Sequence, residues 1–176
     1  MGPPESELEE FTSKPPKLTF SDAMKIPPNL RNLCIMCIAW LAASFNNYLV
    51  LFEIQYFPGN VFVNNTASCT SDILAFCTAG FLMSYISFEK SLVASYFIAI
   101  LGGLAICFMA NQPANAWMFP LCILIAKFGI SSAYNICYMS NGLLFVTQIS
   151  ATTLGICNLF ARTATIVAPF VAAVYA

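Results

Sequence analysis

The sequence predicts an all-α protein, a polytopic bundle of about five transmembrane helices. Of its 176 residues, 59% are hydrophobic and only 9% are charged, and the mean hydropathy is +0.76. Soluble domains are about half apolar and about a quarter charged. The apolar residues form long runs and lack the alternation, in segments of roughly ten residues, that a β-barrel would need. We therefore expect an integral membrane protein.

The chain divides into two regions. Residues 1–30 form a polar arm that holds most of the charges and six of the ten prolines, and residues 31–176 form the hydrophobic bundle. The arm begins with acidic residues and lacks the basic start of a secretory signal, so it is not expected to be one. Its amphipathic stretch 18–26 is expected to lie at the membrane surface.

A bilayer core needs about 20 apolar residues per helix. The runs that meet this length are Asn32–Phe52, Cys69–Phe88, Ser91–Ala110, Trp117–Met139 and Thr152–Tyr175. The first span is followed by the turn residues Pro58-Gly59-Asn60, and the fourth by Ser140-Asn141-Gly142. Pro120 and Pro169 lie within spans and are expected to kink them.

Basic residues indicate the orientation of the bundle. Lys14, Lys17, Lys25 and Arg31 precede the first span, and Lys90 joins the second span to the third. In a five-span protein these positions lie on one side of the membrane, which is expected to be the cytosolic side or its equivalent.

The composition also excludes several functions. With a formal charge of −1 there is no basic surface for phosphates, so no nucleic-acid partner is expected. The chain has no histidine, which removes the usual zinc ligand and general base. Since no nucleophile–base pair, metal cluster or phosphate loop is found, we expect neither an enzyme nor a cofactor or metal site.

Cysteines, small residues and a glycosylation sequon give weaker signals. The eight cysteines, including the Cys34-x-x-Cys37 pair, are expected to pack as small apolar residues. Asn64-Asn65-Thr66 is a sequon in a predicted loop, which matters only if that loop faces a secretory lumen. Helix packing is also expected for two further sets: Asn46, Asn47, Ser131, Ser132, Asn135, Thr163 and Thr165, and Gly80, Gly102, Gly103, Gly129 and Gly155.

Three charged residues inside spans are the candidates for chemistry. Arg162 and Lys127 lie near the middle of the fifth and fourth spans, where each costs about 2.5–3.5 kcal/mol on insertion scales. Asp72 lies near the start of the second span, where the helix dipole favours it. Two cations at similar depth suit an anionic ligand. The alternative is that they pair with Asp72, with backbone carbonyls or with a neighbouring subunit.

A family resemblance extends over about residues 19–175. The segment 126–138 (Ala-Lys-Phe-Gly-Ile-Ser-Ser-Ala-Tyr-Asn-Ile-Cys-Tyr) resembles the tenth helix of the organic cation/anion transporter branch of the major facilitator superfamily. Residues 154–162 with 166–170 resemble the eleventh helix. Residues 28–31 with Trp40 resemble the start of the seventh, and residues 72–75 the start of the eighth. The resemblance implies helices seven to eleven, which is half of a major-facilitator-type fold.

The resemblance also implies roles. Arg162 matches the position that anchors anions in the family, and Asp72 an acidic position near the cavity. Trp40, Tyr134, Asn135 and Tyr138 would line the cavity wall. Two segments depart from the family: residues 143–147 stand in place of Glu-Leu-Tyr-Pro-Thr, with Ser150 where an arginine would follow, and residues 87–91 replace a Gly-Arg-Arg loop. The charged latch of the cytosolic gate is therefore expected to be missing.

Two functions follow. Alternating access moves one repeat against another, which five helices cannot do alone. The first hypothesis is thus a carrier-derived scaffolding subunit, with other membrane subunits and lipids as partners, in the mitochondrial inner membrane as part of a respiratory-chain type of complex. The alternative is the C-terminal half of a split organic-anion transporter, for instance in the plasma membrane. Its substrate residues would be Arg162, Asp72, Lys127, Asn135, Tyr138 and Trp40.

Overall fold

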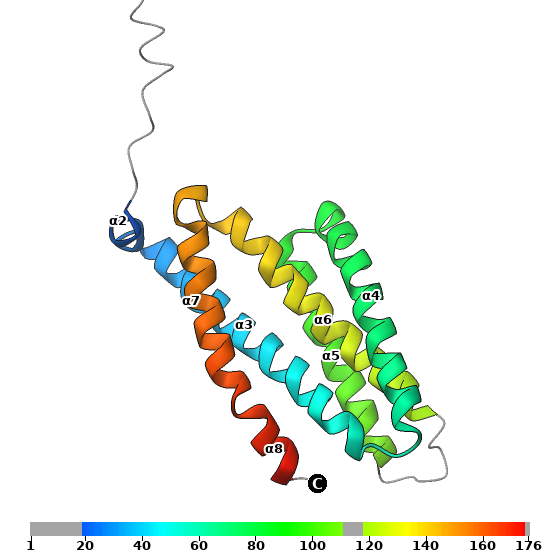
Figure 1. Cartoon of the computed structure of the whole chain (residues 1–176). Coiled ribbons are helices and arrows are strands. Elements are labelled where there is room, and N and C mark those ends of the chain that lie inside the picture. Colours follow the sequence, from blue (N-terminus) through cyan, green and yellow to red (C-terminus); the bar gives the residue numbers. More distant parts are fainter. Residues whose placement is uncertain (1–18, 111–117, 175–176) are drawn as a thin grey trace, which may run out of the picture.

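The computed structural model describes residues 19–110 and 118–174 (Figure 1). Within these ranges the chain is helical and has no strand. The elements are α2 (Phe20–Met24), α3 (Pro27–Glu53), the 3₁₀ turn η1 (Ile54–Tyr56), α4 (Val61–Tyr85), α5 (Phe88–Ala110), α6 (Phe119–Leu144), α7 (Thr147–Thr165) and α8 (Ala168–Val174). Most of the predicted arm, including Lys14 and Lys17, and the predicted start of the fourth span at Trp117 lie outside the described residues.

The prediction of a five-span helical bundle is confirmed. Five segments are long and apolar enough to cross a membrane: Pro27–Tyr56, Val61–Tyr85, Phe88–Met109, Phe119–Leu144 and Thr147–Val174. The last of these spans contains both α7 and α8. The protein is thus an integral membrane protein, and its helices must satisfy their own backbone hydrogen bonds in lipid.

Helix starts differ from the predicted boundaries for reasons of capping. Pro27 and Pro28 form the first turn of α3, inside the predicted arm, because a residue without an N–H is tolerated there. Helix α4 begins at Val61, well before Cys69, since the Asn60 side chain accepts a hydrogen bond from the Phe62 N–H at 2.9 Å. The predicted turn before it is present, with Gly59 at φ 101°.

The early start of α4 corrects two expectations. The sequon Asn64-Asn65-Thr66 lies inside a helix and not in a loop, and Asn64 is fully buried with its Nδ2 donating to the Pro58 carbonyl at 3.3 Å. Asn64 is therefore not presented as a glycan acceptor. Asp72 lies well inside α4, so the predicted placement near the positive end of the helix dipole is wrong.

The two prolines behave differently. Pro120 lies in the first turn of α6. It therefore starts the helix, and the prediction that it kinks a span is wrong. The break between α7 and α8 comes immediately before Pro169, where the missing N–H interrupts the helical ladder, and the second predicted kink is confirmed. Helix α6 also continues through Ser140-Asn141-Gly142, where the sequence predicts the end of the fourth span.

Helix α6 is the centre of the bundle. It packs along α4 and α5, while α3 packs against α7 and α8 and joins the two groups through its contact with α6 (Figure 1). Of the five spans α6 is the most buried and α5 the least. Polar side chains on α6 are consequently held inside the protein, whereas the described helices leave most of the α5 surface uncovered.

Two glycines bring α5 and α6 into backbone contact. A Cβ added at Gly102 would lie 2.4 Å from the Ala126 backbone, and one at Gly129 would lie 2.4 Å from the Ala99 backbone nitrogen. Small residues allow this close approach between membrane helices. At Gly80, Gly103 and Gly155 an added Cβ would meet nothing within 4 Å, so the expectation of close contact is wrong for those three.

The ends of the bundle agree with the predicted sidedness. Helix α2, the α4–α5 connection and the α6–α7 connection lie at one end, and α8 ends at the other (Figure 1). Lys25, Arg31 and Lys90 therefore share one end of the bundle.

Candidate functional site

A polar stripe runs along one face of α6. Lys127, Ser131, Tyr134, Asn135 and Tyr138 follow helical spacings of three and four residues, so they lie one above another. Lys127, Ser131 and Asn135 are buried, Tyr134 is half-buried and Tyr138 is exposed. In a membrane bundle such a stripe faces partners from neighbouring helices or a cavity. The structure shows both, at different heights.

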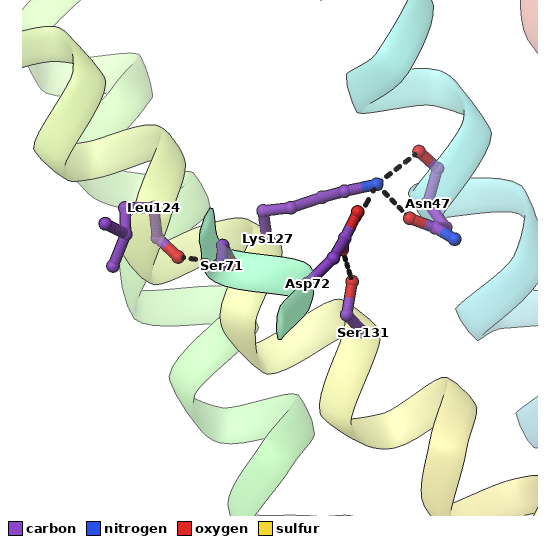
Figure 2. Close-up of polar contacts among 6 residues, drawn as sticks. All are labelled: Asn47, Ser71, Asp72, Leu124, Lys127 and Ser131. Atoms are coloured by element: carbon purple, nitrogen blue, oxygen red, sulfur yellow. Dashed lines mark hydrogen bonds and ion pairs between the residues drawn. The ribbon is translucent and has the colours of Figure 1, made fainter. Parts of the chain in front are cut away.

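At one height Lys127 forms a cluster with α3 and α4 (Figure 2). Its Nζ lies 3.9 Å from Asp72 Oδ1 and donates to the Asn47 carbonyl oxygen at 3.3 Å and to Asn47 Oδ1. The same oxygen, Asp72 Oδ1, accepts a hydrogen bond from the Ser131 hydroxyl. Ser71, the residue before Asp72, donates from its Oγ to the carbonyl of Leu124 at 3.0 Å, about one turn before Lys127 on α6. These contacts tie α3, α4 and α6 together.

This cluster is neutral overall. Lys127 is 3% exposed, and Asp72 supplies the opposite charge that a buried ammonium requires. Pairing with Asp72 is the alternative to an anion-binding role for Lys127. Asn47, expected only to pack, is the second partner of the ammonium. Its role could not be found from sequence, because the α3 register relative to α6 is set by tertiary packing.

Arg162 of α7 contacts α3 at Tyr48, the residue that follows Asn47. Its Nη1 donates to the Tyr48 hydroxyl at 2.7 Å, and its guanidinium carbon lies 5.9 Å from the centre of the Tyr48 ring. Arg162 is exposed on the protein surface. Among residues 19–110 and 118–174 the ion pairs are Lys25–Asp22 and Lys127–Asp72, so no carboxylate neutralises Arg162 there. Tyr48 was missed by sequence reasoning, since a tyrosine near a span end is typical of any membrane helix.

An aromatic group links α3, α6 and α7. The Trp40 ring packs edge-on against Tyr138 at 4.4 Å and Tyr134 at 6.4 Å between ring centres. The two tyrosine hydroxyls lie 3.1 Å apart, and that of Tyr138 donates to Asn158 Oδ1 at 3.2 Å. Asn158 precedes Arg162 by one helical turn, so both lie on the same face of α7. The fully buried Trp40 supports this group from behind, and its Nε1 has no partner in the described structure.

A cavity of about 550 Å³ opens between α4 and α6 beside the aromatic group. It is lined by Phe76, Ala79, Gly80, Tyr134, Asn135, Tyr138 and Met139. An apolar, aromatic wall with one amide is typical of small-molecule sites. Of the predicted site residues, the structure brings Asn135 and Tyr138 to this cavity, and Trp40 contacts it only through the two tyrosine rings. Arg162 lies outside the cavity lining, and so do Asp72 and Lys127 of the neutral cluster.

The corner between α6 and α7 is held by neutral groups. Asn141 Nδ2 donates to both the carbonyl and the hydroxyl oxygen of Ser150, each at 2.9 Å. Thr153 Oγ1 in turn donates to Asn141 Oδ1 at 2.9 Å. Ser150 is the residue that stands where the resemblance leads one to expect an arginine. The Ser150 contacts at this corner are thus hydrogen bonds between neutral groups, where a family member would carry a charged residue.

Comparison with known proteins gives the following. No family model matches the chain. Solute carrier family 22 member 21 and organic cation/carnitine transporter 2, both of Mus musculus, are each 26% identical over 167 residues, which is 94% of this chain and 29% of the relative. Organic cation/carnitine transporter 2 of Homo sapiens is 24% identical over the same share. The chain thus spans less than a third of the length of these curated relatives.

These matches confirm the resemblance to organic cation/anion transporters of the major facilitator superfamily, over a part of each relative's length. The relatives are transporters and not enzymes.

Proposed function

We propose that this transporter-related membrane protein forms one wall of the binding site of a carrier for small organic ions, with Arg162 holding an anionic group of the substrate. The observation that carries the proposal is the guanidinium of Arg162 within a membrane span, which no carboxylate of residues 19–110 and 118–174 neutralises. A cation in that setting needs a partner, and a carboxylate is the group that a guanidinium binds best, through two parallel hydrogen bonds. Tyr48 takes one donor of the guanidinium and leaves others for a ligand.

The aromatic side of the site suits a second group on the substrate. Quaternary ammonium groups bind against tyrosine and tryptophan rings by cation–π attraction. Tyr134, Tyr138 and Phe76 line the cavity between α4 and α6, and Tyr138 is joined through Asn158 to the face that carries Arg162. Carnitine, which appears in the names of two relatives, carries both an ammonium and a carboxylate. A zwitterion of this kind is the proposed substrate class.

The bundle is proposed to act together with further helices. In carriers of this type one repeat moves against another around a site near the midplane. The five spans would supply α3, α4, α6 and α7 to one side of that site, and the other side would come from the remainder of a longer polypeptide or from a separate chain, as in the split-transporter hypothesis. The plasma membrane is the proposed location. The mitochondrial inner membrane stays a prediction without further support.

The scaffolding role predicted from the sequence also stays a prediction. It differs from the carrier role in what Arg162 should do. In a scaffold the arginine would bind a neighbouring subunit, and its loss would weaken assembly. In a carrier it would bind the substrate, and its loss would weaken ligand binding while assembly persists.

Binding of two related ligands tests the proposal. Carnitine carries the carboxylate, and choline offers the ammonium without it. With the chain in its native membrane assembly, Arg162→Gln should weaken carnitine binding at least tenfold and leave choline binding unchanged, as measured by equilibrium binding of radiolabelled ligand. Arg31→Gln removes the chain's other arginine, which lies at the bundle end, and serves as the matched control. Equal carnitine binding by Arg162→Gln and the wild type would refute the proposal, and loss of co-purifying chains without saturable binding would favour the scaffold.

A further inference from the structure

Three of the eight cysteines meet where α3, α6 and α7 pack together. Cys37 Sγ of α3 lies 3.4 Å from Cys157 Sγ of α7. Cys137 of α6 belongs to the same core cluster as Cys157, and both are fully buried. The sequence pair Cys34-x-x-Cys37 does not describe this arrangement, because Cys34 is exposed on α3 while Cys37 contacts a residue 120 positions away.

The contact between the two sulfur atoms is suited to bond formation. A disulfide has a sulfur–sulfur distance of about 2.05 Å, so each Sγ needs to move by less than about 1 Å from its present position. Cys37 is half-buried and can be reached by a small reagent, whereas Cys157 is enclosed. A metal site is a poorer interpretation: no group of three or more metal-binding side chains is found in the described part of the chain.

We propose that Cys37 and Cys157 are an oxidisable dithiol that closes into a disulfide between α3 and α7, with a small peroxide as oxidant. In the first step the Cys37 sulfur attacks one peroxide oxygen, the oxygen–oxygen bond breaks, and a sulfenic acid and one water are formed. In the second step the Cys157 sulfur attacks the Cys37 sulfur, and the hydroxyl leaves as a second water. Two thiols and one hydrogen peroxide thus give one disulfide and two waters.

The bond would join the two helices that carry Tyr48 and Arg162. It would also close a long loop of the chain, and a cross-link of that kind restricts the unfolded state. Oxidation should therefore raise the thermal unfolding midpoint of the protein by several degrees, and dithiothreitol should reverse the rise.

The test uses the full chain in its own membrane. Membranes are treated with hydrogen peroxide or left reduced, the protein is denatured, and free thiols are labelled with N-ethylmaleimide before intact mass spectrometry. The oxidised wild type should carry two fewer labels than the reduced protein. A proteolytic digest should contain one disulfide-linked peptide pair, holding Cys37 and Cys157.

Matched variants separate this pair from the other thiols. Cys37→Ser should lose no labels on oxidation, and Cys157→Ser should lose at most one, as the sulfenic acid of Cys37. Cys34→Ser and Cys137→Ser should still lose two. The proposal is overturned if the wild type keeps all its labels, if the linked peptides contain another pair such as Cys37 and Cys137, or if Cys37→Ser still loses two labels. The wild-type peptide map decides the matter even where a variant folds poorly.

Discussion

At the scale of single residues, two cations that look alike in sequence have different surroundings. Lys127 is enclosed and neutralised by Asp72, with Asn47 completing its hydrogen bonds. Arg162 is exposed and contacts only the neutral hydroxyl of Tyr48 among its polar partners in the described structure. A buried ion pair adds little net stability, but removing one partner leaves a charge that nothing compensates. The two residues should therefore respond differently to substitution.

We predict that Asp72→Asn destabilises the bundle by about 3–5 kcal/mol at most. The loss should be near the lower value, because 39% of the Asp72 side chain is exposed to solvent. The Lys127 ammonium would remain buried without an anion. Asp22→Asn, which breaks the exposed pair with Lys25, should cost at most about 1 kcal/mol. Unfolding by denaturing detergent measures both. Adding Lys127→Met to an Asp72→Leu background should restore much of the stability, and equal effects of the two asparagine variants would contradict the interpretation.

At the scale of elements, glycine spacing decides how α5 and α6 pack. Gly102 and Gly103 are neighbours in sequence, but only Gly102 faces the Ala126 backbone. We predict that Gly102→Ala forces the two helices apart and costs about 1–3 kcal/mol or more, as overpacking does. Gly103→Ala should be neutral or stabilising by up to about 1 kcal/mol through helix propensity. Thermal unfolding in detergent gives both signs, and a similar loss in both variants would show that this contact is misplaced.

The corner between α6 and α7 gives a second prediction at this scale. Thr153→Val keeps the shape of the side chain but removes the hydrogen bond to Asn141 and leaves a buried acceptor without its partner. The expected cost is about 1–3 kcal/mol in the free energy of unfolding. Thr152→Val makes the same chemical change at the exposed neighbouring residue and should cost less than about 0.5 kcal/mol. If both variants unfold alike, the neutral corner contributes nothing to stability.

At the scale of the whole molecule, the five spans place successive connections on alternate sides of the membrane. The α3–α4 connection lies at the end opposite the α4–α5 connection, which lies at the same end as Lys25 and Arg31 (Figure 1). The positive-inside rule predicts that this basic end lies at the cytosolic side or its equivalent.

We predict the result of a protease-protection experiment in sealed inside-out vesicles, in which the cytosolic face of the membrane is on the outside. An epitope tag inserted after Gly59 should be protected from the protease, while a tag inserted after Ser87 should be cleaved. Permeabilising the vesicles with detergent should expose both tags and serves as the control. Cleavage of both tags in intact vesicles, or the reverse pattern, would contradict the topology or its orientation.

Much of the fold could be predicted because it depends on local properties. Length and hydropathy identify membrane helices without knowledge of their partners, since each helix satisfies its own backbone. The errors were also local: Asn60 and the prolines at 27, 28 and 120 move helix starts by capping and first-turn effects that hydropathy does not register. The candidate site was predicted less completely, because Tyr48 and Asn47 act only through contacts with helices far along the chain.

The sequence by itself determined that the protein is a membrane bundle, that Arg162, Lys127 and Asp72 are its unusual residues, and that it resembles part of an organic-ion carrier. Only the tertiary structure decided that Asp72 neutralises Lys127 and leaves Arg162 without an acid partner in the described chain, and that Cys37 meets Cys157. The physical reason is that hydropathy acts along a single helix, whereas charge pairing and thiol contact depend on the rotation and register of helices packed against one another.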